Sequence, residues 1–191
     1  MSTTSLALIV LVIGAAFFYL GQRSIIGQRE SANVRPHSLP HYYGAWSGLV
    51  ATIPALLLLV VLSVFDGVVF KQMVRDFYPP EILALSHMDQ EIALAKVMNV
   101  VQGIRFGEVD PWIQAAGDAW IRWQSTSDQL ITVITLAVSV LGGFFAYRQI
   151  NPDFRSRNNV ERIILWTLIV SSTVAIITTI GIVLSVLFES I

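Results

Sequence analysis

Long apolar runs separated by charged segments dominate the pattern of this chain. Four runs contain no Asp, Glu, Lys, Arg or His: residues 2–22, 42–65, 129–147 and 163–188. A helix rises about 1.5 Å per residue, so about 20 apolar residues cross a hydrocarbon core of roughly 30 Å. The pattern therefore predicts an all-α integral membrane protein with four transmembrane helices.

Composition supports a membrane protein. The chain is 54% hydrophobic and 13% charged, with a mean hydropathy of +0.67, which is outside the range of ordinary soluble domains. It has no Cys, so disulfides and thiolate sites are excluded. The net charge of −1, without a dense run of Lys and Arg, argues against nucleic-acid binding. No positive residue precedes the first run, so we expect an uncleaved helix rather than a signal peptide.

Arginines between the spans set the predicted orientation, because Lys and Arg in short loops resist translocation. Residues 23–41 include three arginines, and the other short connection has four: Arg148, Arg155, Arg157 and Arg162. Both loops are therefore predicted to be cytoplasmic. Three regions follow: a first transmembrane hairpin with a basic loop (1–65), an external segment (66–128) and a second hairpin (129–191). Both termini and the external segment would lie outside.

The external segment is predicted to contain a pair of short helices. For the first, Pro79, Pro80 and Glu81 resemble a helix start, and Ser86 followed by Asp89 offers a second possible start. Its one apolar face is formed by Met88, Ile92, Ala95, Met98 and Val101, and it would end at Gly103 and Gly107.

The second helix of the pair is predicted to start at Asp110 and Pro111. It presents an apolar stripe of Ile113, Ala116, Trp120 and Trp123. Core packing or an anchor at the membrane interface explains this stripe better than a ligand site does.

The spans offer little chemistry. Because they contain no ionisable residue, the chain alone is a poor candidate for a pump or an ion channel. Pro54 could form a gate, although proline kinks usually shape packing. The fourth span carries a stripe of small and hydroxyl residues at helical spacing: Thr167, Ser171, Ala175, Thr178, Gly181 and Ser185. We interpret it as a helix-packing surface, with a polar pore lining as the alternative.

No catalytic residue, cofactor or metal ion is expected. His37 and His41 could share a helix face as metal ligands, but Pro36 and Pro40 oppose a continuous helix there, and His87 is predicted to lie across the membrane. The sequence has no GxxxxGK[ST], HExxH or GxSxG pattern. Enzymatic activity is therefore not predicted.

Two strings carry a family resemblance: HSLPHYYG at residues 37–44 and NPDFRSRNNVER at residues 151–162, the latter leading into a span that closes with GIVLSVLFES. They resemble the amino-terminal region of PstC-type permeases of the phosphate ABC transporter, in a branch with an extension of three spans. The resemblance implies binding-protein-dependent import of inorganic phosphate across a bacterial inner membrane. It also implies a second permease subunit, ATP-binding subunits and a periplasmic phosphate-binding protein as partners. The fourth span would be the first helix of the permease core.

Family permeases continue with further spans and a cytoplasmic coupling loop of the EAA type, for which residues 1–191 contain no counterpart. The resemblance therefore implies the amino-terminal part of a permease, and it transfers no phosphate-binding residue. The external segment has nine acidic and five basic residues, an excess of four negative charges that would repel phosphate. The alternative is a self-contained membrane scaffold or assembly subunit. The reading frame beyond Ile191 would distinguish the two.

Overall fold

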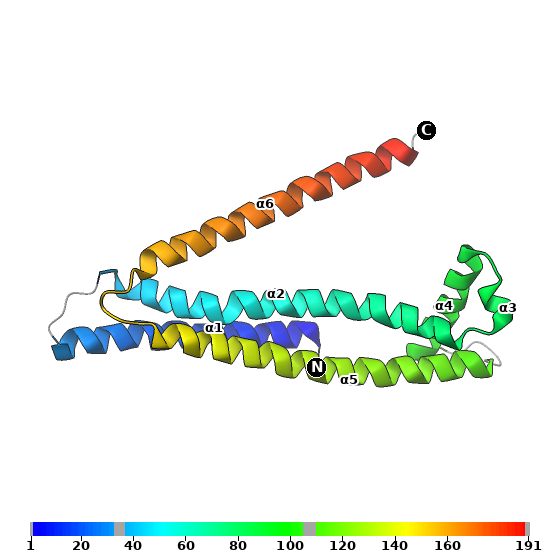
Figure 1. The fold of residues 1–191 in the computed structure, drawn as a ribbon, viewed down its shortest axis with the longest axis horizontal. Coiled ribbons are helices and arrows are strands. Elements are labelled where there is room, and N and C mark those ends of the chain that lie inside the picture. The colour runs from blue at the N-terminus through cyan, green and yellow to red at the C-terminus, as the bar shows by residue number, and fades with distance from the viewer. Residues whose placement is uncertain (1, 33–36, 105–109, 190–191) are drawn as a thin grey trace. The chain divides into compact units, whose positions relative to one another are not determined.

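The computed structural model describes residues 2–32, 37–104 and 110–189, without the side chains of 29–32. Within these ranges the regular structure is entirely helical, which confirms the predicted fold class (Figure 1). The helices are α1 (Thr3–Ala32), α2 (Pro40–Val74), α3 (Pro80–Leu83), α4 (His87–Val101), α5 (Pro111–Arg148) and α6 (Ser156–Glu189), with a 3-10 turn at Arg75–Phe77.

Four helices, α1, α2, α5 and α6, are long and apolar enough to cross a membrane, as predicted. On the side of residues 66–128, α2 and α5 extend well beyond their charge-free runs. With 35 and 38 residues, α2 and α5 are about 52 and 57 Å long, far more than a core of roughly 30 Å requires. Both helices therefore continue into residues 66–128, the segment that is predicted to be external.

One prediction about the external segment is wrong in detail. The helix that starts at Pro111 is not a separate short element, because it continues without a break into the third span as α5. Charged residues at Asp118, Arg122 and Asp128 interrupt the apolar pattern but not the backbone hydrogen bonding. Helix propagation is cooperative, and no proline follows Pro111 within α5 to stop it.

The chain divides into two compact units. We call Met1–Val12 with Ile53–Val140 the cap unit, and Ile13–Thr52 with Leu141–Ile191 the junction unit. These units are defined by packing, whereas the three predicted regions follow membrane topology. The boundaries of those regions remain predictions.

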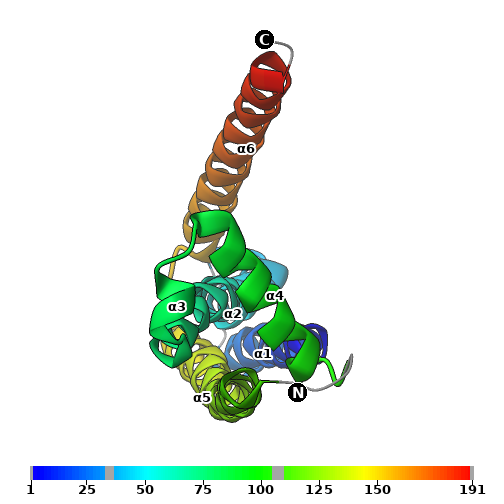
Figure 2. The ribbon, with the colours of Figure 1, turned by 90° about the vertical axis from the view of Figure 1, so that its right-hand side faces the viewer.

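An aromatic core holds the cap unit together, and Figure 2 shows α3 and α4 beside the end of α2 and the start of α5. Its buried residues are Phe70, Val74, Tyr78, Ala93, Leu94, Val97, Ile113, Ala116 and Trp120. The rings of Phe70 and Trp120 lie 5.5 Å apart, edge to face. The predicted stripe on α5 is thus confirmed as core packing, with Trp123 partly buried against it. A smaller cluster, Leu6, Leu59 and Ile131, lies in the membrane part of the same unit.

The start of α4 is as predicted, but its buried face is not. The Ser86 hydroxyl accepts a hydrogen bond from the Asp89 amide at 3.3 Å, and α3 begins at Pro80. Gly103, with φ of +77°, follows the end of α4, whereas Gly107 lies outside the described residues.

Residues Ala93, Leu94 and Val97 form the buried face of α4, while Met88 and Ile92 are 74% and 53% exposed. The expected face is therefore wrong at its first positions. Apolar residues occupy two neighbouring stripes of this helix, so periodicity alone leaves its rotation open. Contact with Phe70, Tyr78 and Ile113 selects the stripe that is buried.

Candidate functional site

The two strings that carry the family resemblance pack against each other in the junction unit. The Tyr43 hydroxyl donates to the Pro152 carbonyl at 3.2 Å, and the His37 amide donates to the same oxygen at 3.0 Å. The rings of Trp46 and Phe154 lie 5.5 Å apart. Tyr43 is fully buried, together with Ile25 and Ile150. Sequence reasoning treated the strings separately, whereas the structure makes them one site, which we call the junction site (residues 37–46 and 150–157).

Arg157 connects the start of α6 to the start of α2. Its backbone amide lies 3.5 Å from the Ser38 hydroxyl, and its guanidinium lies 5.9 Å from the centre of the Tyr42 ring. Its Nε donates to Glu161 Oε1 at 2.7 Å. This surface ion pair adds little stability, because both side chains are more than half exposed. The ion pair instead holds the Arg157 guanidinium beside the starts of α2 and α6.

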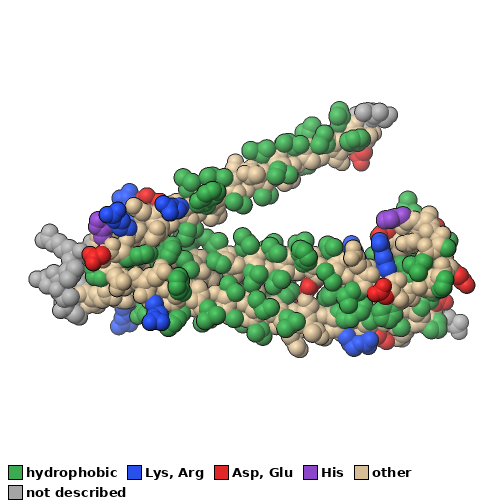
Figure 3. All heavy atoms as spheres, viewed as in Figure 1, with side chains coloured by type: hydrophobic (Ala, Val, Ile, Leu, Met, Phe, Trp, Pro, Cys, Tyr) green, Lys and Arg blue, Asp and Glu red, His purple; other side chains and the backbone are tan. Residues whose placement is uncertain are grey.

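The four arginines predicted to set the topology are all exposed. Arg148 closes α5 and lies over the Phe144 ring at 5.9 Å, Arg155 precedes α6, and Arg157 and Arg162 lie in its first two turns. Figure 3 shows Lys and Arg side chains gathered at the beginning of α6. Their role in orientation stays a prediction.

Close contacts between α1, α2 and α5 depend on glycines that sequence reasoning did not single out. A Cβ at Gly44 would lie 2.6 Å from the Phe18 carbonyl oxygen, and one at Gly142 would lie 2.8 Å from that of Val50. Main-chain atoms cannot move aside as a side chain can, so these positions require glycine. The signal that could have revealed them is the four-residue spacing of Gly44 and Gly48, since small-xxx-small patterns mark close helix contacts.

Ser47 adds a polar contact between the same helices. Its side chain is fully buried, and its hydroxyl lies 3.0 Å from the Phe17 carbonyl of α1 and 3.0 Å from the Tyr43 carbonyl of its own helix. A hydroxyl in an apolar setting needs an acceptor, and here one acceptor belongs to the neighbouring helix. The α1–α2 pair is therefore fixed by shape and by hydrogen bonding.

Every residue of the predicted packing stripe on α6 is exposed. The Thr167 and Thr178 hydroxyls each donate to the carbonyl four residues earlier, at 2.9 Å, and nothing lies within 4 Å of a Cβ built on Gly181. Ser171, Ala175 and Ser185 share this exposure. The stripe therefore makes no contact here that would decide between packing and pore lining, and it stays a prediction.

A pocket of about 250 Å³ with two carboxylates in its lining lies in the cap unit, where the charge-free runs of α2 and α5 meet residues 66–128. Asp66 and Asp128 line it together with Ser63, Thr132 and Trp120, and the Ser127 hydroxyl donates to Asp66 Oδ2 at 2.5 Å. Two carboxylates make this pocket unfavourable for phosphate. Sequence reasoning missed it, although both acids directly flank the ends of two apolar runs.

The histidines do not come together as ligands. His37 lies in a bend before α2, whereas His41 is in its first turn and stacks on Tyr42 with ring centres 4.3 Å apart. Among the described residues, no group of three or more His, Cys, Asp or Glu is placed to hold a metal ion.

Together these features define a class of protein: an all-helical membrane protein with a helical cap, a basic junction and spans without ionisable side chains. The model of the family described as "Phosphate ATP-binding cassette transporter" matches residues 7–178, nearly the whole chain. The chain belongs to this family, and it is a membrane component of phosphate ABC transport. Comparisons with curated proteins and with solved structures find no significant match.

Proposed function

We propose that this chain is the amino-terminal membrane part of a permease subunit that imports inorganic phosphate across a bacterial inner membrane. The observation that carries the proposal is the family match over residues 7–178, which includes most of α1, all of α2 to α5 and most of α6. The partners in this proposal are a second permease subunit, ATP-binding subunits and a periplasmic phosphate-binding protein.

Within such a transporter, the chain would serve as an assembly and anchoring module rather than as the phosphate path. The spans offer no cation to a phosphate, and the pocket of the cap unit contains two carboxylates. By contrast, α6 has an exposed apolar surface: Leu168, Val174 and Ile176 are all about 60% exposed. A surface of this kind suits lateral contact with further permease helices.

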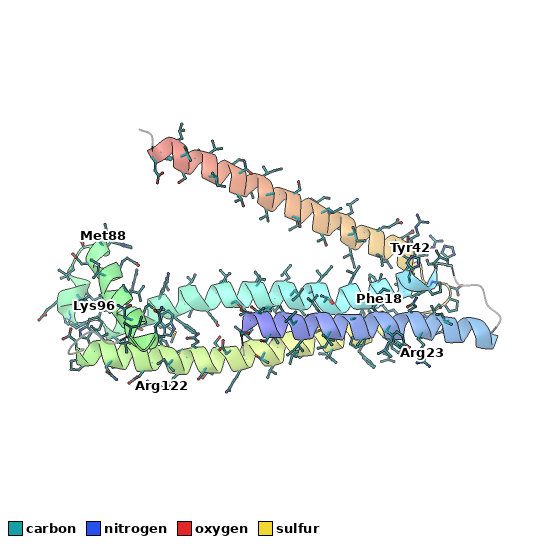
Figure 4. All side chains as sticks on the ribbon, turned by 180° about the vertical axis from the view of Figure 1, so that it is seen from behind. Phe18, Arg23, Tyr42, Met88, Lys96 and Arg122 are labelled. Carbon is teal, nitrogen blue, oxygen red and sulfur yellow. The ribbon has the colours of Figure 1, made fainter. Side chains whose placement is uncertain are left out.

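The cap unit offers the second contact surface. Four apolar side chains that are close in sequence on α3, α4 and their connection are exposed: Leu83, Leu85, Met88 and Ile92. Met88 lies on the outside of the cap (Figure 4). Exposed apolar side chains of this density are typical of interaction sites. In the proposed orientation this surface is periplasmic, where the phosphate-binding protein delivers its cargo.

Phosphate uptake tests the proposal. Disruption of the gene in cells grown at low phosphate should abolish high-affinity uptake of labelled phosphate and leave sulfate uptake unchanged. Restoration by the full-length gene is the control. Normal phosphate uptake without the gene would contradict the transport role.

Labelling of single cysteines tests the proposed orientation, and the cysteine-free chain makes the result simple to interpret. With the outer membrane permeabilised, an impermeant thiol reagent should label Ser127→Cys and spare Asn158→Cys. The reverse pattern would show that both termini and residues 66–128 are cytoplasmic.

The scaffold alternative makes a different prediction for the same disruption. Loss of a scaffold would lower the amounts of the partner subunits, so uptake would return when those subunits are overproduced. A permease subunit cannot be replaced in this way, and uptake would stay absent.

A further inference from the structure

An apolar groove of about 450 Å³ lies in the junction unit. It is lined by α1 between Gly14 and Phe18, by α2 between Ala45 and Thr52, and by Val160 and Ile164 of α6. Thr52 is the only lining residue with a polar side chain, and the α1 and α2 segments lie within charge-free runs. In a membrane, such a groove faces hydrocarbon.

One end of the groove is positively charged. Tyr42 precedes Ala45 by three positions on α2, and Arg157 precedes Val160 by three positions on α6, so each lies one turn beyond the groove on the same helix face. The Arg157 guanidinium lies 5.9 Å from the centre of the Tyr42 ring, which places the cation at this end. Figure 4 labels Phe18 on the groove and Tyr42 at its end.

This end of the groove is accessible and carries a net positive charge. The Arg157 side chain is 62% exposed. Although Glu161 pairs with it, residues 148–162 contain four arginines against two acidic residues, Asp153 and Glu161. The amino-terminal end of the 34-residue helix α6 adds a further positive potential. An anion at this end would therefore be attracted.

We propose that the groove holds one acyl chain of an anionic glycerophospholipid, with the lipid phosphate beside Arg157. The α2 segment from Ala45 to Thr52 is about 10 Å long, a length that suits part of an extended acyl chain. An apolar groove that ends at an exposed cation matches an amphiphile with an anionic head. A transmembrane helix would place apolar side chains opposite the guanidinium, at an energetic cost.

This inference goes beyond the proposed function, because it concerns a structural lipid and does not depend on which solute is transported. In the proposed orientation the lipid belongs to the cytoplasmic leaflet. Anionic lipids in this leaflet are attracted to basic segments beside membrane spans by about 1 kcal/mol per Lys or Arg, which is roughly a fivefold change in binding.

Photolabelling in membranes that contain the full-length protein tests the inference. The probes are phosphatidylglycerol and phosphatidylcholine with the same diazirine-bearing acyl chain, and labelled peptides are identified by mass spectrometry. Phosphatidylglycerol should label residues 14–18 and 45–52 several-fold more than phosphatidylcholine does. Equal labelling by both lipids would overturn the role of Arg157.

Matched variants separate the head group from the acyl chain. Arg157→Gln should lower phosphatidylglycerol labelling about fivefold, whereas Arg162→Gln, about 140° further round α6, should have a much smaller effect. Ala15→Phe should block labelling of the groove by both lipids, and Ala16→Phe, outside the groove, is its control. Equal effects within either pair would contradict the proposal. So would a cysteine at Ala15 that cross-links to another protein chain, because the groove would then hold a helix.

Discussion

Two stripes of small residues in the junction unit have similar chemistry and different surroundings. On α2, Gly44, Ser47 and Ala51 are buried at helical spacing, against α1. On α6, the stripe from Thr167 to Ser185 is exposed. On α6, every described residue from Ile164 to Glu189 is exposed. Small residues at helical spacing therefore permit a close helix contact without identifying its partner.

The two stripes also differ in which atoms lie near the Cβ positions of their glycines. At Gly44 a main-chain carbonyl lies where a Cβ would be, whereas nothing lies within 4 Å of the Cβ position at Gly181. The α2 stripe is used within this chain. The α6 stripe is free to serve a contact with other permease helices, which fits the assembly role that we propose for α6.

The largest expected effect comes from adding one methyl group to the α2 stripe. Gly44→Ala places a Cβ 2.6 Å from the Phe18 carbonyl oxygen and should lower the free energy of unfolding by roughly 1–3 kcal/mol. Gly67→Ala on the same helix meets nothing within 4 Å and should raise it by up to about 1 kcal/mol through helix propensity. Thermal unfolding of the purified proteins in detergent, followed by circular dichroism, measures both. Equal stability would show that α1 and α2 can separate at no cost.

The second effect concerns the α6 stripe and appears only in the assembled transporter. Leucine at Ser171, Thr178 or Gly181 of the full-length protein should reduce co-purification of the partner subunits about tenfold, because the added volume opposes close packing. Ile169→Leu and Ile176→Leu, on other faces of α6, are the controls. Equal yields and equal phosphate uptake for both sets would refute the packing interpretation. Normal assembly with a selective loss of uptake would support a pore lining instead.

A partial effect is expected from the basic segment between α5 and α6. Replacement of Arg155, Arg157 and Arg162 together by Gln leaves Arg148 as the only arginine of that segment, so a second, inverted population should appear. Cysteine labelling at Asn158 in intact cells measures its share. If Asn158→Cys stays fully protected, the neighbouring spans rather than these arginines determine the topology.

The smallest effect is a pH dependence in the cap unit. Burial raises the pKa of the Tyr78 phenol above its usual value of 10.0; Arg75 opposes this shift and Glu91 adds to it. Because folding raises this pKa, the stability that it contributes is fully present at pH values below the pKa of Tyr78 in the unfolded chain. It is lost as the pH rises through the pKa of Tyr78 in the folded protein. Tyr78→Phe also removes the hydrogen bond to the Gln90 carbonyl, worth about 1 kcal/mol.

The difference in unfolding free energy between wild type and Tyr78→Phe should therefore be constant near pH 8 and should decrease above about pH 10. Chemical unfolding of both proteins across this range measures it, and the comparison cancels the titration of other groups. A difference that does not change with pH would show that Tyr78 is not protected by burial.

Sequence by itself determined the elements that depend on local composition. Charge-free runs of about 20 residues predict helical spans, because a helix of that length crosses the hydrocarbon core and satisfies its own backbone polar groups. Helix starts at Pro80, Ser86 and Pro111 were also predictable, since caps and prolines act on their own turn. The two strings at the junction site also indicate the family without knowledge of their contact.

Only the tertiary structure decided which faces meet. It showed that Ala93 and Leu94, rather than Met88 and Ile92, face the core of the cap unit, and that α5 continues from the cap into the membrane. It also brought Tyr43 to Pro152, 109 positions away in the chain. Periodicity fixes a stripe on one helix, but burial depends on the shape of another helix that is distant in sequence. That pairing is a property of the packed chain and not of any local segment.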